Sequence, residues 1–160
     1  MKSDIQRVTH LGICVSDLER SLRFYGEVFH CVEVGRFEGK GDPSATILGL
    51  PASLELTAVY LERDGWRIEL LHYPTPGHRG PAAPRPMNQL GYTHLSFRVS
   101  DLEAVLARIE ACGGRVLRET YQGTLGSKVV FAVDPDGVRF ELIEAPGDPN
   151  AIPGQPRPPQ

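Results

Sequence analysis

The chain has few cysteines, no excess of basic charge and no long run of apolar residues. Its 160 residues include three widely spaced cysteines, an odd number that predicts small buried thiols in a reducing cytoplasm rather than a disulfide framework. A net charge of −3 at pH 7 gives no basic surface for nucleic acid. No segment approaches the roughly 20 apolar residues of a membrane span, and the N-terminus lacks the apolar region of a secretory signal. We therefore expect a cytoplasmic protein with a small-molecule partner, binding neither nucleic acid nor membrane.

The chain does contain an internal repeat. Residues 9–19 read THLGICVSDLE and residues 93–103 read THLSFRVSDLE, with eight of eleven positions identical. A second pair follows, DGWRIELL at 64–71 and DGVRFELI at 136–143. Repeats of this kind indicate two copies of one structural unit. Each copy opens on a histidine and closes on a glutamate.

Each half predicts a strand, a helix and three further strands. Alternating apolar residues predict strands at 8–15 and 92–99, and each Ser-Asp-Leu-Glu motif that follows, from Ser16 and from Ser100, predicts a capping box that begins a helix. Arg63–Asp64–Gly65 predicts a hairpin turn. Proline marks a connector and a flexible tail. The predicted organisation is a first module at 6–74, a connector at 75–90, a second module at 91–145 and a tail at 146–160.

The two modules differ in length. His10 and Glu69 are 59 residues apart, whereas His94 and Glu141 are 47 residues apart, so the first module has twelve more residues. We place this excess in the Gly39–Pro51 stretch, because its glycines and prolines indicate a loop. Added loops on a rigid scaffold often carry specificity.

His10, Glu69, His94 and Glu141 are candidate metal ligands. Period-2 alternation turns each away from its apolar neighbours, onto the sheet face opposite the helices. If the modules pair about a pseudo-twofold axis, the imidazoles and carboxylates of these four residues converge on one point. Such a nitrogen and oxygen set suits a divalent ion such as Ni, Zn, Co, Mn or Fe, with open positions for water or substrate.

The chain resembles the vicinal oxygen chelate superfamily, which includes glyoxalase I, methylmalonyl-CoA epimerase, extradiol dioxygenases and the bleomycin-resistance proteins. The resemblance covers roughly residues 6–145 and is carried by the repeated THLxxxVSDLE and by DPDGVRFELIE near the end. It implies an α+β fold of two tandem βαβββ modules, forming a curved mixed sheet around a metal-binding cleft. It also implies a homodimer, and ligands on the first and last strand of each module, which are the four residues above.

The resemblance implies a metal-dependent lyase or isomerase that transfers a proton alpha to a carbonyl or thioester. The His/Glu/His/Glu set is similar to bacterial glyoxalase I, and IELLHYP at 68–74 is similar to the epimerases. Glu141 is the leading candidate for the catalytic base, and Glu69 is the second. The alternatives are an extradiol-type dioxygenase and a non-catalytic drug-binding protein. The complete set of ligand positions argues against the drug-binding protein. Phe131, which stands where ring-cleaving enzymes usually have tyrosine, argues against the dioxygenase.

Three further residues are candidates for contact with substrate, and a fourth is a candidate for an additional base. Arg67 and Arg139 each lie two residues before a candidate glutamate, so they share its face and could steer an anionic substrate. Phe131 is a third candidate. Glu55 stands near the place where some epimerases have an additional base, but its facing depends on strand register.

Overall fold

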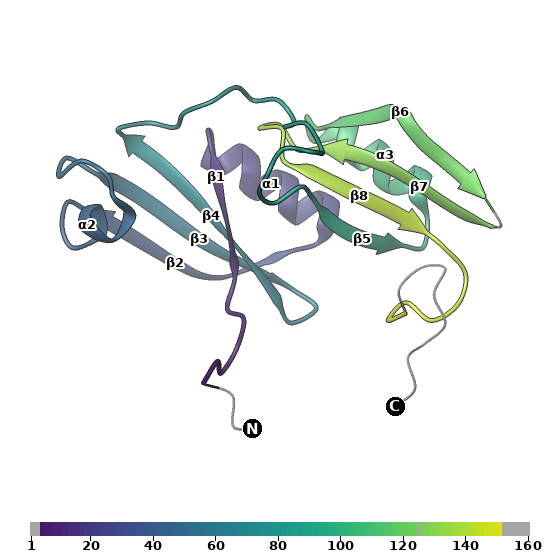
Figure 1. Cartoon of the computed structure of the whole chain (residues 1–160), viewed down its shortest axis with the longest axis horizontal. Coiled ribbons are helices and arrows are strands. Elements are labelled where there is room, and N and C mark those ends of the chain that lie inside the picture. The colour runs from purple at the N-terminus through teal and green to yellow at the C-terminus, as the bar shows by residue number, and fades with distance from the viewer. Residues whose placement is uncertain (1–3, 125, 152–160) are drawn as a thin grey trace. The chain divides into compact units, whose positions relative to one another are not determined.

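The computed structural model describes residues 4–124 and 126–151, and the chain divides into two compact units, Met1–Gly80 and Pro81–Gln160. The elements of the first unit are β1 (Leu11–Val15), α1 (Leu18–Phe29), β2 (Val32–Lys40), α2 (Ser44–Leu48), β3 (Glu55–Arg63) and β4 (Trp66–Thr75) (Figure 1). Those of the second unit are β5 (Leu95–Val99), α3 (Leu102–Ala111), β6 (Arg115–Thr124), β7 (Ser127–Val133) and β8 (Arg139–Glu144). Both units run strand–helix–strand–strand–strand, and α2 is an insertion in the first.

Each unit contains one four-stranded mixed sheet of the same topology. The strand orders are β1-β4-β3-β2 and β5-β8-β7-β6. In each sheet the first strand runs parallel to the last strand of its unit, and the other pairs are antiparallel. The first and last strands of each module are therefore neighbours. Within each module, this pairing places the histidine-bearing motif beside the glutamate-bearing motif. The predicted α+β class with two βαβββ modules is confirmed.

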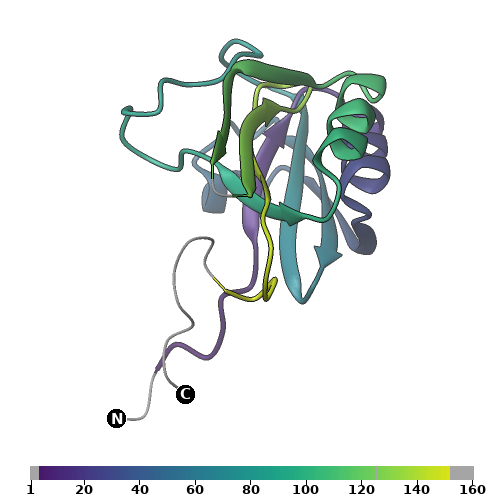
Figure 2. The same ribbon diagram turned by 90° about the vertical axis from the view of Figure 1, so that its right-hand side faces the viewer.

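One face of each sheet packs against the helix of its own unit. Along β4 the apolar side chains of Ile68 and Leu70 are buried, and Phe24 and Tyr25 of α1 are fully buried in the same unit. In the second unit α3 contacts β6, β7 and β8, and Figure 2 shows this helix along one side of its strands. Because side chains alternate along a strand, the residues between these apolar positions lie on the opposite face.

The cap of each long helix is one residue later than predicted. A capping box that starts at Ser16 or Ser100 would make the serine the N-cap, but the aspartate that follows it is the N-cap. Asp17 is the N-cap of α1, and its carboxylate accepts a hydrogen bond from the backbone N–H of Arg20 at 3.0 Å. Asp101 caps α3 through Ala104 in the same way. Both serine and aspartate are favoured caps, so the motif located the helix starts but the prediction of serine as the cap was wrong.

Three other expectations need correction. The strands predicted from residues 8 and 92 begin at Leu11 and Leu95, so His10 and His94 each stand immediately before a strand. The Gly39–Pro51 stretch contains the helix α2. Of the cysteines, only Cys112 is buried, whereas the others are half-buried or exposed.

Residues 76–94 join the units without a helix or strand, and the predicted connector at 75–90 falls within this segment except for Thr75, which ends β4. Of the predicted tail at 146–160, residues 152–160 lie outside the described residues. No helix in the described part of the chain has the length and apolar character needed to cross a membrane.

Candidate functional site

The first unit brings His10 and Glu69 together. Parallel pairing of β1 with β4 sets Gly12 opposite Glu69, and His10 lies two residues before Gly12 on the same side. The His10 Nε2 is 3.1 Å from the Glu69 Oε2. The Glu69 side chain is 14% exposed. We call His10, Glu69 and the residues that contact them the first half-site.

Tyr60 belongs to this half-site as well. Antiparallel pairing of β3 with β4 sets Tyr60 opposite Glu69, and the Tyr60 hydroxyl donates a hydrogen bond to the Glu69 carboxylate. That hydrogen bond, together with partial burial and the negative charge of Glu69, raises the pKa of Tyr60 to about 12. The Tyr60 ring also meets the His10 ring edge to face, with 5.3 Å between the ring centroids. Tyr60 therefore contacts both candidate ligands of its unit.

The second unit brings His94 and Glu141 together in an equivalent place. The His94 Nε2 is 3.7 Å from the Glu141 Oε2, and the Glu141 side chain is 25% exposed. Phe131 pairs with Glu141 across β7 and β8, and its ring meets the His94 ring edge to face at 5.2 Å. The Ser96 hydroxyl donates a 2.7 Å hydrogen bond to Glu141 Oε2. These residues form the second half-site.

In both half-sites the threonine before the histidine contacts the far nitrogen of the ring. The Thr9 Oγ1 is 3.1 Å from His10 Nδ1, and the Thr93 Oγ1 is 2.9 Å from His94 Nδ1. A neutral histidine with its Nδ1 proton donated to such an oxygen presents a bare Nε2 lone pair, which is the form that binds metal. In each half-site, Nε2 is the nitrogen that faces the glutamate.

Sequence reasoning missed Tyr60, Ser96, Thr9 and Thr93. Both threonines lie inside the repeated motif, so their repetition was a usable signal. Tyr60 and Ser96 were harder to find, since each occurs in only one module and contacts its glutamate through the register between two strands.

The candidate substrate residues differ in their surroundings. The Arg67 guanidinium forms an ion pair with Glu62, with 2.6 Å between Nε and Oε2. Arg139 begins β8 and is half-buried. Glu55 forms an ion pair with Lys40, whose Nζ lies 2.6 Å from Oε1. Arg98 hydrogen-bonds the backbone carbonyls of Ala145, Pro146, Gly147 and Ala151, so it ties the segment after β8 to β5.

The insertion in the first unit lies on the same sheet face as Glu69. Leu71 and Tyr73 follow Glu69 on this face of β4, because they are two and four residues along the strand. Both pack against a buried apolar cluster formed by Ala45 of α2 and three residues in or near β3, which are Leu54, Leu56 and Ala58. The first half-site therefore stands beside an apolar wall that includes a residue of the inserted helix α2.

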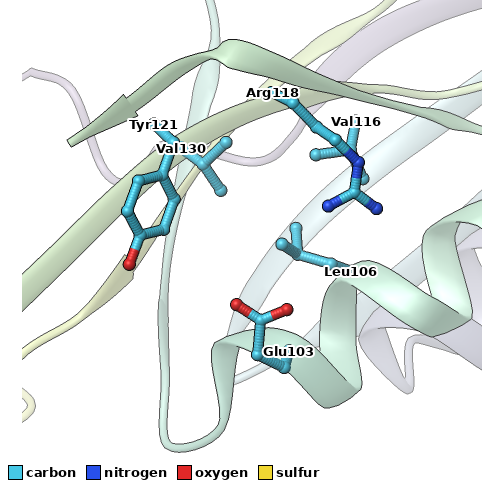
Figure 3. Close-up of a pocket in the computed structure, with 6 residues that line it drawn as sticks. All are labelled: Glu103, Leu106, Val116, Arg118, Tyr121 and Val130. Carbon is cyan, nitrogen blue, oxygen red and sulfur yellow. The ribbon is translucent and has the colours of Figure 1, made fainter. Parts of the chain in front are cut away.

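A pocket of about 340 Å³ lies elsewhere, on the helix side of the second sheet. Figure 3 shows Leu106 and Glu103 of α3 on one side of this pocket, with Val116, Arg118 and Tyr121 of β6 opposite. The Arg118 guanidinium is already paired with Glu110 at 2.9 Å. This pocket contains neither His94 nor Glu141, so it is separate from the second half-site.

The residues of each half-site fit one half of a metal centre. Each supplies one imidazole nitrogen and one carboxylate, and these are ligands for first-row divalent ions. Within residues 4–124 and 126–151, no group of three or more His, Cys, Asp or Glu side chains is close enough to hold an ion. Each half-site by itself thus supplies two such ligands.

Comparison with known proteins identifies the family. The model of the Glyoxalase/Bleomycin resistance protein/Dioxygenase superfamily matches residues 7–142, and the chain belongs to this superfamily. The resemblance inferred from the sequence is thus confirmed.

Individual relatives are distant in sequence. A lactoylglutathione lyase of Haemophilus influenzae is 27% identical and covers 86% of this chain and 92% of its own length. The chain spans only 47% of a relative with the same name from Schizosaccharomyces pombe. The structure of a glyoxalase family protein from Bacillus cereus matches with a TM-score of 0.78 at 24% identity, over 91% of this chain and 98% of that protein. The fosfomycin resistance protein FosX from Listeria monocytogenes, in complex with Mn(II) and sulfate, matches with a TM-score of 0.55 at 17% identity, over 89% and 94%.

Proposed function

We propose that this protein is a metal-dependent lyase or isomerase that moves a proton at the carbon alpha to a carbonyl or thioester. In this proposal, His10, Glu69, His94 and Glu141 together hold one divalent ion. The observation that carries the proposal is the pairing of a histidine Nε2 with a glutamate oxygen in both units, at 3.1 Å and 3.7 Å. Two such pairs in equivalent places are difficult to explain as separate structural contacts.

The proposed cofactor is Ni, Zn, Co, Mn or Fe in the divalent state. Superfamily members of the same fold bind divalent metals, and FosX has been crystallised with Mn(II). Bound between the four residues, such an ion would supply a Lewis acid that stabilises negative charge on the vicinal oxygens of a substrate.

The glutamates would carry the proton. A C–H bond alpha to a carbonyl is a weak acid, so a carboxylate must lie within hydrogen-bond reach of the proton. We assign this role to Glu141, because its side chain is more exposed than that of Glu69 and lies farther from its histidine. Glu141 would take the proton while the electron pair of the C–H bond moves to the carbonyl oxygen, and a glutamate would then return a proton to carbon. Glu69 is the second candidate for this step.

The substrate class follows from the relatives and from the surroundings of the half-sites. Relatives named lactoylglutathione lyase favour a hemithioacetal, and a 2-methyl acyl-CoA ester demands the same proton transfer. Phe131 offers an apolar surface beside His94. Arg67 and Arg139 remain proposed contacts for an anionic group, and Arg67 would have to exchange its ion pair with Glu62. We further propose that the protein acts in the cytoplasm as a homodimer.

The decisive experiment measures metal and proton exchange together. Elemental analysis of untagged protein should find about one divalent ion per four-residue site, and His10→Ala and Glu141→Gln should each lose it. His78→Ala is the control, because His78 is exposed in the segment that follows β4. Solvent deuterium should enter hemithioacetals or 2-methyl acyl-CoA esters only with the metal-loaded protein. Stoichiometric metal retained in both variants would contradict the proposal, and oxygen uptake with catechols and Fe(II) would favour the dioxygenase instead.

A further inference from the structure

Each candidate glutamate receives one hydroxyl hydrogen bond, but the two hydroxyls come from opposite sides. Glu69 lies on β4 between β1 and β3, and its donor is Tyr60 on β3. Glu141 lies on β8 between β5 and β7, and its donor is Ser96 on β5. The donor therefore comes from the antiparallel neighbour in one module and from the parallel neighbour in the other.

In each module, the position that corresponds to the donor of the other module has a residue without a hydroxyl. Gly12 stands opposite Glu69 in the register where Ser96 stands opposite Glu141, and Phe131 stands opposite Glu141 where Tyr60 stands opposite Glu69. Neither alternative position carries a hydroxyl. Each module thus retains one donor for its glutamate and lacks the other.

We propose that Tyr60 is a positioning residue that holds Glu69 beside His10 and so makes Glu69 the fixed carboxylate of the centre. This inference rests on the proposed metal centre. A hydrogen bond from a phenol on a neighbouring strand limits the rotation of the glutamate side chain, and ligands held by such outer contacts bind metal more tightly. The Tyr60 ring also packs against His10, so one side chain orders both ligands.

The geometry of the two half-sites agrees with unequal roles. Glu69 is 14% exposed and lies 3.1 Å from its histidine, whereas Glu141 is 25% exposed and lies 3.7 Å from its histidine. In the second half-site the two contacts come from separate residues, since Ser96 contacts Glu141 and Phe131 contacts the ring of His94. With Glu69 held in this way, Glu141 would be the carboxylate that carries the proton.

Tyr60→Phe tests the proposal, since it removes the hydroxyl and keeps the ring against His10. Co(II) affinity, measured by competition with a chromogenic chelator, should fall about 10- to 100-fold, the usual effect of losing such an outer contact. Unfolding of the metal-free protein should report an intact fold. Tyr73→Phe is the matched control and should bind Co(II) like the unmodified protein. Tyr73 lies on the same strand face as Glu69, and its pKa is raised by burial and by the charges of Cys14 and Glu69 rather than by a hydrogen bond.

A rescue variant separates the hydroxyl from the rest of the side chain. Gly12→Ser places a hydroxyl where the second module has Ser96. A Cβ at Gly12 would lie 3.8 Å from Glu69 Oε2 and 3.3 Å from Leu71 Cδ1, the movable end of a side chain. In the Tyr60→Phe background, Gly12→Ser should restore most of the Co(II) affinity, whereas Gly12→Ala should not. Equal affinity of the serine and alanine forms would overturn the proposal.

His10→Ala distinguishes the failure of this inference from the failure of the proposed function. If His10→Ala loses Co(II) while Tyr60→Phe binds it within twofold of the unmodified protein, the role of Tyr60 is refuted and the metal centre stands. If His10→Ala binds Co(II) normally, the metal centre itself is refuted.

Discussion

The hydroxyl of Ser96 lies 2.7 Å from Oε2 of Glu141, the same carboxylate oxygen that approaches His94. Register explains the contact, because β5 runs parallel to β8 and sets Ser96 directly opposite Glu141. The oxygen that would contact a metal or a substrate proton is therefore held by a neighbouring strand.

Ser96→Ala should slow proton exchange by about tenfold. A hydrogen bond to a charged group contributes about 1.5–3 kcal/mol, and 1.4 kcal/mol corresponds to a factor of ten. Deuterium incorporation into substrate measures the rate, and metal content shows whether the centre survives. Ser100→Ala is the control because Ser100 is exposed outside the second half-site. Equal exchange rates in the two variants would show that Ser96 does not position Glu141.

Thr9→Val and Thr93→Val should each weaken metal binding by about 10-fold or more, since valine keeps the shape of threonine but leaves the histidine Nδ1 without its hydroxyl partner. The two hydroxyl contacts are 3.1 Å and 2.9 Å, so the two variants should have similar effects. Competition with a chelator measures the affinity, and NMR of the imidazole nitrogens reports the tautomer. If a variant contains both histidine tautomers but binds metal with unchanged affinity, the threonine fixes the tautomer without contributing to metal binding, and the prediction is wrong.

The sequence repeat predicted much of this arrangement. It located the main strands, the two long helices and the four candidate ligands, because both copies of the motif have the apolar spacing of a strand followed by a helix. The structure places each histidine beside the glutamate of its own module, as the parallel pairing of the first and last strands requires.

Other features depend on information that local patterns do not contain. Tyr60 faces Glu69 only because of the register between β3 and β4, and alternation alone cannot fix register. The helix α2 is five residues long and lies between glycine and proline residues, so it has too few turns for a helical stripe. Its helical turns are instead supported by contacts such as that of Asp42 with the backbone N–H and hydroxyl of Thr46.

Leu54→Ala should destabilise the protein by about 2–5 kcal/mol, the usual cost of removing a fully buried leucine. Leu54 is 0% exposed and belongs to the apolar cluster through which Ala45 of α2 packs near Leu71 and Tyr73, on the sheet face of Glu69. Urea unfolding of the whole protein measures the loss. Ile47→Ala is the matched control in α2, because Ile47 is 77% exposed and its replacement should change stability by less than about 0.5 kcal/mol. If the two variants are equally stable, the insertion is not held by this cluster.

Glu144→Gln should lower the unfolding temperature at neutral pH and have little effect in acid. Glu144 ends β8, and its carboxylate accepts hydrogen bonds from Lys128 Nζ at 2.8 Å and from the backbone N–H of Leu102 at 2.7 Å. The Lys128 hydrogen bond, followed by that of Leu102, holds the pKa of Glu144 below its ordinary value of 4.5. A carboxyl with a lowered pKa in the folded state contributes stability above its unfolded pKa, and that contribution is lost as the pH falls through the folded value.

Scanning calorimetry from pH 7 to pH 3 should therefore show a gap in unfolding temperature between the unmodified protein and Glu144→Gln that closes below about pH 4.5. Glu119→Gln, which replaces an exposed glutamate of β6, should show only a small gap throughout this range. A Glu144→Gln gap that stays constant down to pH 3 would mean that the amide disturbs α3 through its shape. In that case the charge of Glu144 would not be what fixes the first turn of this helix to the end of β8.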